Sequence, residues 1–485
     1  MTNKPQNDAI QSRLRELPSI GKLLESTTLT SLRTDLPLSL VTQAARETIE
    51  MARAAILSGG SETISLDELA QQVSDKAQSA NMPSLRPAIN ATGIVLHTGL
   101  GRAKLADAAV KAIQEVAASH SLVEVDSETG KRGSRQNHAR ELLQELTGAE
   151  DAAVVNNCAG AVFLAVAVLA AGREVIISRG ELVEIGGAFR MPDIIKASGA
   201  TLLEVGTTNR TRISDYADAI SERTGLILRC HPSNFAVIGF TEETPTTELV
   251  ALGRERAIPV MDDQGSGALL DLARFGVKGW GGSLPESVKA GSDIITASGD
   301  KLMGATQAGI LLGRSDFIQK IMAHPLARAL RVDKLTLAGL EATLRLYRDP
   351  ETALREIPTL RYIARTAQKL EFMAGLLATL LKTSLPKEKY TIRLVPEQSQ
   401  VGGGSLPGEN LPTICVALSS IDSSITPDAI AAHLRRHNPA IFARIRDNAV
   451  LFDPRTMEDD EVSQIAESVK FLTPGQEGSF GFESY

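Results

Sequence analysis

The sequence predicts an α/β protein with a large, mainly parallel sheet, a helical unit before it and a smaller α+β unit after it. Short β-branched runs alternate with helical segments from Arg86 to about Arg331, a pattern typical of βα units around a parallel sheet. The chain is rich in Ala, Leu, Ile, Val and Gly and only 4% aromatic, as expected for strands buried on both faces. Its 485 residues are enough for about three domains.

Residues 1–85 are expected to form the helical domain and its linker. Apolar residues recur at helical spacing from Leu40 to Ile56, which predicts an amphipathic helix. Ser65 is followed by Glu68 three residues later, the pattern of a capping box at the start of another helix. The run Asn81–Ser84 contains a proline that ends this second helix, and we place the linker there.

Residues 86–331 are expected to contain the main sheet. Each expected strand is a short apolar run followed by polar residues or glycine. These strands are Ala152–Val155, Glu174–Ser178, Thr201–Val205, Leu226–Cys230, Pro259–Met261, Asp293–Thr296 and Gly309–Leu312.

Residues 332–485 are expected to form the smaller α+β domain. Long helical patterns come first, and strand-like segments follow, at Leu335–Tyr347, Leu360–Leu381, Tyr390–Val395, Pro412–Ala417 and Ala440–Phe452. The glycine-rich loop Gly402–Ser405 and the tail Gln476–Tyr485 are expected to be mobile.

Charge and cysteine content limit the classes of protein that fit. The chain has 51 basic and 58 acidic residues and a net charge of −7, which argues against a polyanionic partner such as DNA. Its three cysteines form no CxxC pair and are interpreted as reduced thiols. Its histidines show no ligand spacing, so no metal is expected.

Targeting and membrane segments are not expected. Residues 1–10 are polar and lack the apolar core of a signal peptide. The longest apolar stretch, Ala159–Ala171, is shorter than the roughly 20 residues that span a bilayer. These observations predict a cytoplasmic protein without membrane contact.

The most informative stretch is Ser298–Lys301, in a glycine-rich turn between two apolar strands. A lysine withdrawn from water can be neutral and nucleophilic, and it can then form a Schiff base. A lone lysine in such a turn is more often a surface residue, so its neighbours decide between the two interpretations.

Two upstream segments supply those neighbours. Asp262 and Asp263 follow an apolar strand, where α/β sheets bind ligands, and a carboxylate there can keep a pyridine nitrogen protonated. The segment Val155–Ala161 reads as a strand, a turn of small residues and a helix, whose N-terminus can hold a phosphate. This order, completed by Ser-x-x-Lys, resembles the layout of pyridoxal phosphate enzymes with the aspartate aminotransferase fold.

Longer strings resemble one family, bacterial L-seryl-tRNA(Sec) selenium transferase, also called selenocysteine synthase. The resemblance runs over nearly the whole chain and implies the pyridoxal phosphate transferase fold (fold type I). It rests on Leu17–Ile20, Asn90–Thr98 with Gly101 and Arg102, Ser178–Gly187, His231–Phe235, Asp263–Gly267, Ser298–Lys301 and His324–Lys334.

The resemblance implies roles for single residues around the cofactor. Lys301 would carry pyridoxal 5′-phosphate, and Asp300 would act as an acid near the leaving hydroxyl. Asp263 matches the partner of the ring nitrogen, with Asp262 as the alternative. Further cofactor contacts are expected from Cys158, Ala159, Gly160, Ser298 and His231. For His231, a contact with the substrate and a purely structural, hydrogen-bonded role are the alternatives.

The resemblance also implies that Arg102, Arg328 and Arg331 bind the anionic selenium donor. Arg328 and Arg331 are three residues apart on an expected helix, so both would project from one face. Guanidinium groups suit tetrahedral oxyanions. Without the resemblance, the same residues would be interpreted as a surface ion-pair cluster.

The sequence departs from the family pattern at three places. After the apolar pair Leu302-Met303, the chain has Gly304–Gln307 where the family usually has Gly-Gly-Pro-Gln. Gly99 replaces the usual asparagine, and Cys158 and Gly160 stand in a turn that is usually rich in Asn and Ala. We expect these changes to affect loop geometry and donor affinity more than cofactor chemistry.

The implied reaction is a β-replacement on seryl-tRNA(Sec) with selenium from selenophosphate, giving selenocysteinyl-tRNA(Sec). The helical unit would recognise the tRNA, although residues 1–60 contain seven basic and six acidic residues and so form no basic arm. The family assembles as a homodecamer, a ring of dimers. Several weakly charged surfaces would then act on one tRNA.

Two other functions stay open. The first is a pyridoxal phosphate lyase or eliminase that acts on a small amino acid or amino sugar phosphate; the extension before Arg86 argues against it. The second is a non-catalytic RNA-binding scaffold on the same fold. The presence of Asp263, Asp300 and Lys301 argues against the scaffold.

Overall fold

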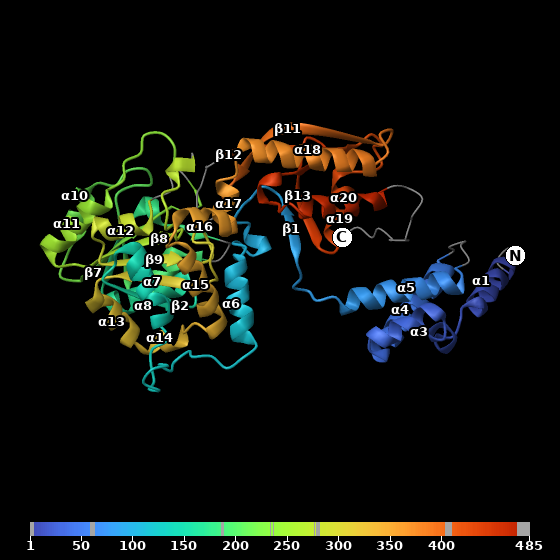
Figure 1. Ribbon diagram of the computed structural model, residues 1–485, viewed down its shortest axis with the longest axis horizontal. Coiled ribbons are helices and arrows are strands. Elements are labelled where there is room, and N and C mark those ends of the chain that lie inside the picture. The colour runs from blue at the N-terminus through green and yellow to red at the C-terminus, as the bar shows by residue number, and fades with distance from the viewer. Residues whose placement is uncertain are drawn as a thin grey trace. The chain divides into compact units, whose positions relative to one another are not determined.

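The computed structural model describes residues 4–58, 64–185, 189–232, 234–235, 237–275, 277, 282–402 and 410–472. Contacts divide the chain into two compact units, Met1–Pro87 and Ala88–Tyr485 (Figure 1). Residues 403–405 of the expected mobile loop and the tail Gln476–Tyr485 lie outside the described residues, as do Gly186, Gly187 and Ser233 of the family strings.

The first unit is helical, as the sequence predicts. Its helices are α1 (Lys4–Glu16), α2 (Ile20–Leu24), α3 (Thr27–Asp35), α4 (Leu38–Leu57) and α5 (Leu66–Asn81). The apolar periodicity of α4 is buried: Val41 and Ala45 pack with Leu69 and Val73 of α5 in one core. The Ser65–Glu68 capping box at the start of α5 is present.

The main sheet of the second unit has the order β2-β10-β9-β8-β7-β3-β6. Only β10 is antiparallel to its neighbours, and the other described pairs are parallel, which confirms the mainly parallel sheet. The strands are β2 (Asp151–Val155), β3 (Glu174–Ser178), β6 (Thr201–Val205), β7 (Thr224–Cys230), β8 (Val260–Gly265), β9 (Ile294–Ser298) and β10 (Gly309–Gly313).

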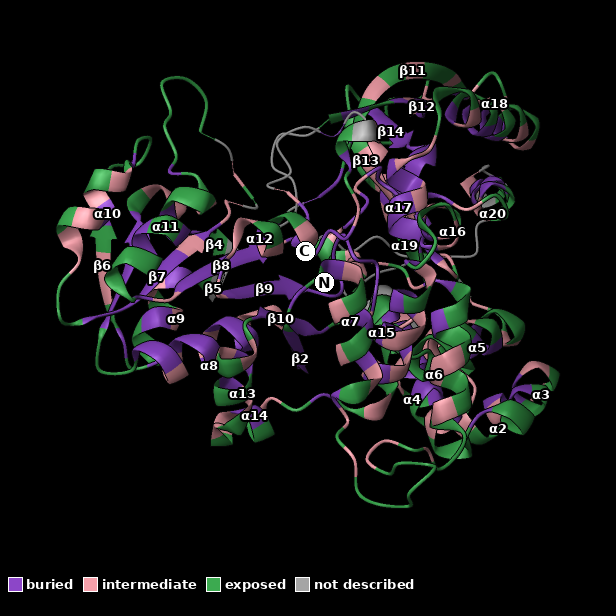
Figure 2. Ribbon diagram, turned by 60° about the vertical axis from the view of Figure 1, so that its left-hand side comes forward, coloured by how far each residue is buried: buried purple, intermediate pink, exposed green. Residues whose placement is uncertain are grey.

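Helices cover both faces of this sheet because successive strand residues point to opposite sides. Val175 and Ile177 pack with α8 (Cys158–Ala170) and α9 (Met191–Ala197). Ile176, between them, packs on the other side with α10 (Ile213–Ala219) and α11 (Thr246–Arg256). Figure 2 shows the buried strands running between these two layers. A separate pair, β4 (Glu184–Ile185) and β5 (Phe189–Arg190), is antiparallel.

A second sheet has the order β1-β13-β14-β12-β11. Its strands are β1 (Ala88–Ala91), β11 (Tyr390–Gln400), β12 (Asn410–Ser420), β13 (Ala440–Arg446) and β14 (Ala449–Phe452). The helices α18 (Ala367–Ser384), α19 (Pro427–Arg436) and α20 (Glu461–Ser468) contribute to its core. The expected α+β character of the C-terminal part is confirmed.

The boundary expected at Arg331 does not coincide with a break in packing. Leu337, Leu340 and Leu344 of α15 (Lys334–Leu346) are buried in the core of the main sheet. Conversely, β1 pairs in parallel with β13 and belongs to the second sheet. Helical periodicity identifies α15 as amphipathic but says nothing of which core its apolar face enters. The three-domain division therefore stays a prediction.

Most of the remaining described α-helices pack on the main sheet. The remaining helices are α6 (Asp107–Ala117), α7 (Asn137–Thr147), α12 (Leu284–Ala290), α13 (Ser315–Ala323), α14 (Pro325–Ala329), α16 (Pro350–Glu356) and α17 (Pro358–Ile363). Within the described ranges, no helix is long and apolar enough to cross a membrane.

Candidate active site

Lys301 lies in the turn between β9 and β10, with only 7% of its surface exposed. The turn is tight at Gly299, where a Cβ atom would lie 2.6 Å from the Thr306 carbonyl oxygen. Burial lowers the pKa of the Lys301 amine, and the nearby Cys158 and Asp263 partly oppose this shift. A buried amine with a lowered pKa is suited to nucleophilic attack and to proton transfer.

Asp263 sits at the same edge of the sheet, between two residues of adjacent strands. Cys230 of β7 and Thr296 of β9 are its register partners, so the three side chains share one face. The Thr296 hydroxyl donates to Asp263 Oδ1 at 2.7 Å. The Cys230 thiol lies 3.7 Å from Oδ2 and the Cys158 thiol 3.5 Å from Oδ1. Burial raises the pKa of the Asp263 carboxyl, which is held by neutral donors.

Asp262 points to the opposite face and has a different partner. Arg229 is its register partner on β7, and the Arg229 guanidinium lies 3.2 Å from Asp262 Oδ1. An ion pair occupies the Asp262 carboxylate, whereas Asp263 faces Cys158 and Lys301. The geometry therefore favours Asp263 as the partner of a ring nitrogen.

The turn after β2 presents the N-terminus of α8 to this site. Asn157 caps the helix, and its side chain accepts from the Gly160 N–H at 2.7 Å. The first N–H groups of a helix lack internal partners and attract anions; here they belong to Cys158 and Ala159. The buried Ser298 hydroxyl at the end of β9 lies beside the Cys158 thiol and partly opposes the rise of the thiol pKa that burial causes. These residues form a cradle beside Lys301.

Arg102 contacts Asp300 directly. Its guanidinium donates to Asp300 Oδ2 at 2.8 Å, and the Ala103 N–H donates to the Asp300 carbonyl oxygen at 3.3 Å. Arg102 has a left-handed backbone with φ 61°, which a non-glycine residue adopts only under constraint. The structure thus brings Arg102, Asp300 and Lys301 together.

Arg328 and Arg331 lie apart from that group. The helix α14 ends at Ala329, so the expectation that both arginines project from one helical face is wrong. Both are exposed, and Arg331 lies 3.8 Å from Glu124. Among the described residues, neither arginine contacts Lys301 or Asp300.

The two arginines nevertheless flank the turn after β2. The Asn156 N–H donates to the carbonyl oxygen of Leu330, between them, at 2.8 Å. Partial desolvation and the charges of Arg135 and Arg328 lower the pKa of Arg331. Such crowding of like charges favours the binding of an anion.

His231 follows β7, and its N–H donates to the Asp263 carbonyl oxygen at 3.1 Å. Both of its ring nitrogens are buried and have no partner among the described residues. Burial and the charge of Arg229 lower the pKa of His231 to about 4, so the ring is neutral at neutral pH. Buried polar atoms without a partner are uncommon in folded proteins, so these two nitrogens are candidates for contact with a bound group.

Two cavities adjoin these residues. One of about 480 Å³ is lined by His231, Glu181 and Arg229. The other, of about 360 Å³, is lined by Asp300 and by Ala305 and Thr306, which differ from the Gly-Pro of the family motif. This difference from the family sequence thus lies in the wall of a cavity next to Asp300.

Comparisons with known proteins bear on this arrangement. Residues 88–458 match the family model described as L-seryl-tRNA selenium transferase, and residues 14–53 match the model for the N-terminal part of selenocysteine synthase. The chain belongs to the L-seryl-tRNA selenium transferase family. An L-seryl-tRNA(Sec) selenium transferase from Geobacter metallireducens is 46% identical over 94% of this chain and 98% of its own length. One from Moorella thermoacetica is 44% identical over 94% and 96%.

A solved structure supports the fold of this family member. D-Glucosaminate-6-phosphate ammonia-lyase aligns with a TM-score of 0.55 at 20% identity, covering 80% of this chain and 96% of its own. At that identity the likeness shows the fold alone. The pyridoxal phosphate transferase fold expected from the sequence is confirmed.

The residues of this transferase fit pyridoxal phosphate. Lys301 supplies a buried amine, Asp263 a buried carboxyl group and the start of α8 a cradle for a phosphate. The ring nitrogens of His231 have no partner among the described residues, so they can contact the cofactor. The described residues contain no group of three or more side chains that could hold a metal.

Several residues at the site were not singled out in the sequence. Thr296 and Cys230 both hydrogen-bond Asp263. They are its register partners in the parallel strands β9 and β7, so a predicted strand register would have identified them. Glu181 is a third: burial raises its pKa to about 8, and its carboxyl accepts from the Cys230 N–H. No local pattern reveals Glu181, because its burial depends on the loop after β3.

Proposed function

We propose that this chain is an L-seryl-tRNA(Sec) selenium transferase, which converts seryl-tRNA(Sec) to selenocysteinyl-tRNA(Sec). The observation that carries the proposal is the family match, which includes the N-terminal unit as well as the body of the enzyme. Relatives of this name align over almost their entire length. A lyase for small molecules has no need of an added helical unit.

Five residues would hold the cofactor. Lys301 would carry it, Asp263 would face its ring nitrogen, Cys158 and Ala159 would offer N–H groups to its phosphate, and His231 would border its ring. When bound, pyridoxal phosphate supplies an electron sink for negative charge at the α-carbon of the seryl group.

Lys301 and Asp300 would move the protons of the reaction. Lys301 would take the proton from the α-carbon and later return it, since burial lowers the pKa of its amine. The bond from the β-carbon to the hydroxyl breaks, and Asp300 would give the departing oxygen a proton, so that water leaves. A bond from selenium to the β-carbon then forms, and the phosphoryl group of selenophosphate passes to water as phosphate.

The Arg102–Asp300 ion pair suggests how donor binding prepares this step. In the structure the Arg102 guanidinium is occupied by Asp300 at 2.8 Å. An oxyanion donor that takes over Arg102 would release the Asp300 carboxyl group toward the substrate. Arg328 and Arg331, beside the turn after β2, would add positive charge for the same anion.

The helical unit would contact the tRNA. Residues 1–60 are almost neutral, with seven basic and six acidic residues, so recognition would depend on shape and on several subunits acting together. The homodecamer implied by the family resemblance would supply those subunits.

One experiment tests this function. Purified protein is incubated with Ser-tRNA(Sec) or Ser-tRNA(Ser), with and without selenophosphate, and the esterified amino acid is identified by mass spectrometry. We expect selenocysteine only from Ser-tRNA(Sec) with selenophosphate. Equal conversion of both tRNAs, or none by protein that shows the visible absorbance of lysine-bound cofactor, would overturn the proposal.

A further inference from the structure

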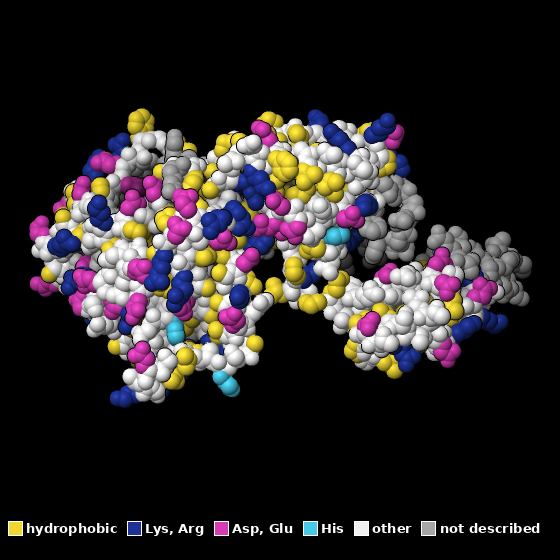
Figure 3. Space-filling view, viewed as in Figure 1, with side chains coloured by type: hydrophobic (Ala, Val, Ile, Leu, Met, Phe, Trp, Pro, Cys, Tyr) yellow, Lys and Arg dark blue, Asp and Glu magenta, His cyan; other side chains and the backbone are white. Residues whose placement is uncertain are grey.

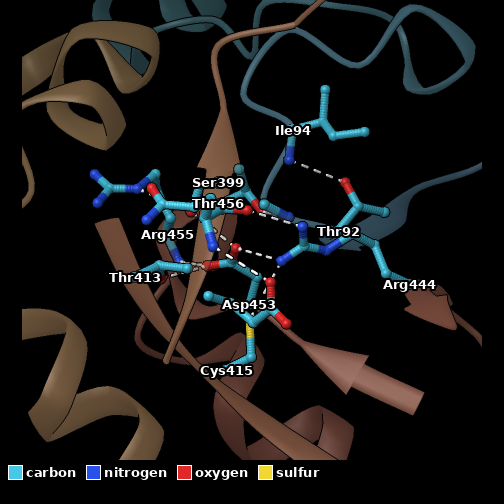
Figure 4. Close-up of polar contacts among 12 residues, drawn as sticks. Thr92, Ile94, Ser399, Thr413, Cys415, Arg444, Asp453, Arg455 and Thr456 are labelled. Carbon is cyan, nitrogen blue, oxygen red and sulfur yellow. Dashed lines mark hydrogen bonds and ion pairs between the residues drawn. The ribbon is translucent and has the colours of Figure 1, made fainter. Parts of the chain in front are cut away.

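A fully buried carboxylate organises the second sheet. Asp453, directly after β14, has 0% of its surface exposed. It accepts hydrogen bonds from Ser399 at 2.8 Å and from Thr413 at 2.9 Å, and Arg444 lies 3.1 Å away (Figure 4). A buried charge persists only when it is paired and hydrogen-bonded in this way.

Thr456, three residues after Asp453, holds a segment that is remote in sequence. Thr456, with 3% of its surface exposed, donates to the Asn90 carbonyl oxygen at 2.6 Å and accepts from the Gly93 N–H at 3.1 Å. At Gly93, whose φ is +72°, a Cβ atom would lie 1.9 Å from an Asp453 carboxylate oxygen. The Asn90–Gly93 turn is therefore fixed by a hydroxyl and by close contact with a carboxylate.

Backbone hydrogen bonds hold the residues that lead from this turn toward the active site. After Gly93, the Val95 N–H donates to the Gln400 carbonyl oxygen at 2.9 Å and the Leu96 N–H to that of Val401 at 2.8 Å. These bonds join the segment to the end of β11, so a shift of the turn would move the segment as a unit.

The segment ends at Arg102. The Arg102 N–H donates to the His97 carbonyl oxygen at 3.0 Å, which closes the loop that sets the left-handed backbone of Arg102. Its guanidinium then reaches Asp300 at 2.8 Å. Hydrogen bonds and the intervening backbone thus connect the second sheet to the guanidinium of Arg102 next to Asp300.

We infer that Thr456 is a positioning residue for donor binding: it holds the Asn90–Gly93 turn and, through residues 94–101, the guanidinium of Arg102. This inference rests on the proposed function, because Arg102 is there the ligand of the oxyanion donor. By this inference, the second sheet influences the affinity for the donor without contacting the donor. Misplacement of a binding group by a fraction of an ångström is enough to change affinity severalfold.

The test compares two single substitutions of buried threonines. Thr456→Val removes the hydroxyl that holds Asn90 and Gly93. Thr413→Val removes another buried hydroxyl, which donates to Asp453 and has no hydrogen bond to the turn. Each loses buried hydrogen bonding, so both are expected to lose comparable stability. Thr456→Ser retains the hydroxyl and serves as the rescue.

We expect Thr456→Val to raise the KM for selenophosphate about tenfold with kcat and cofactor absorbance nearly unchanged. Hydrogen–deuterium exchange should accelerate in peptides covering residues 93–102. Thr413→Val and Thr456→Ser should match the wild type in both measurements. Equal effects of the two valine variants, or normal exchange and KM in Thr456→Val, would overturn the inference.

The exchange measurement also separates this inference from the proposed function. It needs no substrate, so it reports on residues 93–102 even if the wild-type protein does not use selenophosphate. If the wild-type protein is inactive but exchange is faster only in Thr456→Val, the proposed function is contradicted and the positioning of residues 93–102 by Thr456 is supported.

Discussion

At the residue scale, the two adjacent carboxylates of β8 have opposite surroundings. Asp263 is held by the neutral donors Thr296, Cys158 and Cys230, whereas Asp262 is paired with Arg229. The alternation of side chains along a strand predicts that two such neighbours separate. The sequence alone does not say which one faces the lysine, because that depends on the face that α8 covers.

This difference predicts distinct outcomes for two matched substitutions. Asp263→Asn cannot balance a protonated ring nitrogen, so kcat should fall about 100-fold or more with little change in melting temperature. Asp262→Asn leaves the partly buried Arg229 without its ion-pair partner, so melting temperature should fall while kcat of the folded protein stays near wild type. Kinetics and thermal unfolding measure both. The reverse pattern would reassign the ring-nitrogen partner.

Glu181 predicts a pH dependence of stability. Its pKa is about 8 in the folded protein, above the ordinary value of about 4.3 in an unfolded chain. The folded state therefore binds more protons between these values, and stability falls as pH rises from about 4.5 to 8. Glu181→Gln should remove this fall and stabilise the protein by roughly 2–4 kcal/mol at pH 8 relative to wild type.

Denaturant unfolding across this pH range measures the effect. Glu243→Gln is the control, since Glu243 lines the same cavity but is exposed. Parallel pH profiles for the wild type and Glu181→Gln would show that Glu181 is not protonated in the folded state.

At the element scale, the start of α8 links local sequence to cofactor binding. Asn157 caps this helix by accepting from the Gly160 N–H, and Thr366 caps α18 in the same way from the Lys369 N–H. Asn157→Ala and Thr366→Ala should each cost about 1 kcal/mol of stability. Only Asn157→Ala should speed loss of cofactor on dialysis, because only α8 faces Lys301. Equal retention in both variants would mean that α8 does not hold the phosphate.

Much of the element order follows from local patterns. The strands Glu174–Ser178 and Thr201–Val205 have the expected bounds, since each is a short apolar run that ends in turn residues. The strand β1 escaped prediction because four residues carry little periodicity and its partner β13 lies far along the chain. The end of α14 before Arg331 was missed because no strong stop signal follows Ala329.

Contacts across long sequence distances explain what else was missed. The Arg102–Asp300 ion pair joins residues 198 positions apart, so spacing alone could not indicate it. The family resemblance indicated that both residues belong to the site, and their mutual pairing comes from the structure. The roles assigned to the individual site residues stay predictions.

At the scale of the whole molecule, net charge does not mark the tRNA partner. The chain carries a net charge of −7, and Figure 3 shows basic and acidic side chains interspersed on the face in view. Few phosphate contacts per subunit are therefore expected. The logarithm of tRNA affinity should fall with the logarithm of salt concentration with a slope shallower than about −5. Filter binding at several salt concentrations measures it, and a steeper slope would indicate a basic surface that the sequence does not reveal.

The proposed function requires Lys301 to serve a selenium transferase reaction on aminoacyl-tRNA. The most direct measurement follows radioactive selenium from labelled selenophosphate into Ser-tRNA(Sec), with the wild type and Lys301→Ala compared at equal protein concentration. We predict incorporation that releases as selenocysteine on ester hydrolysis with the wild type, and a loss of at least about 1,000-fold with Lys301→Ala. Undiminished incorporation by Lys301→Ala would rule out this role of Lys301, and no incorporation by cofactor-loaded wild type would rule out the proposed function.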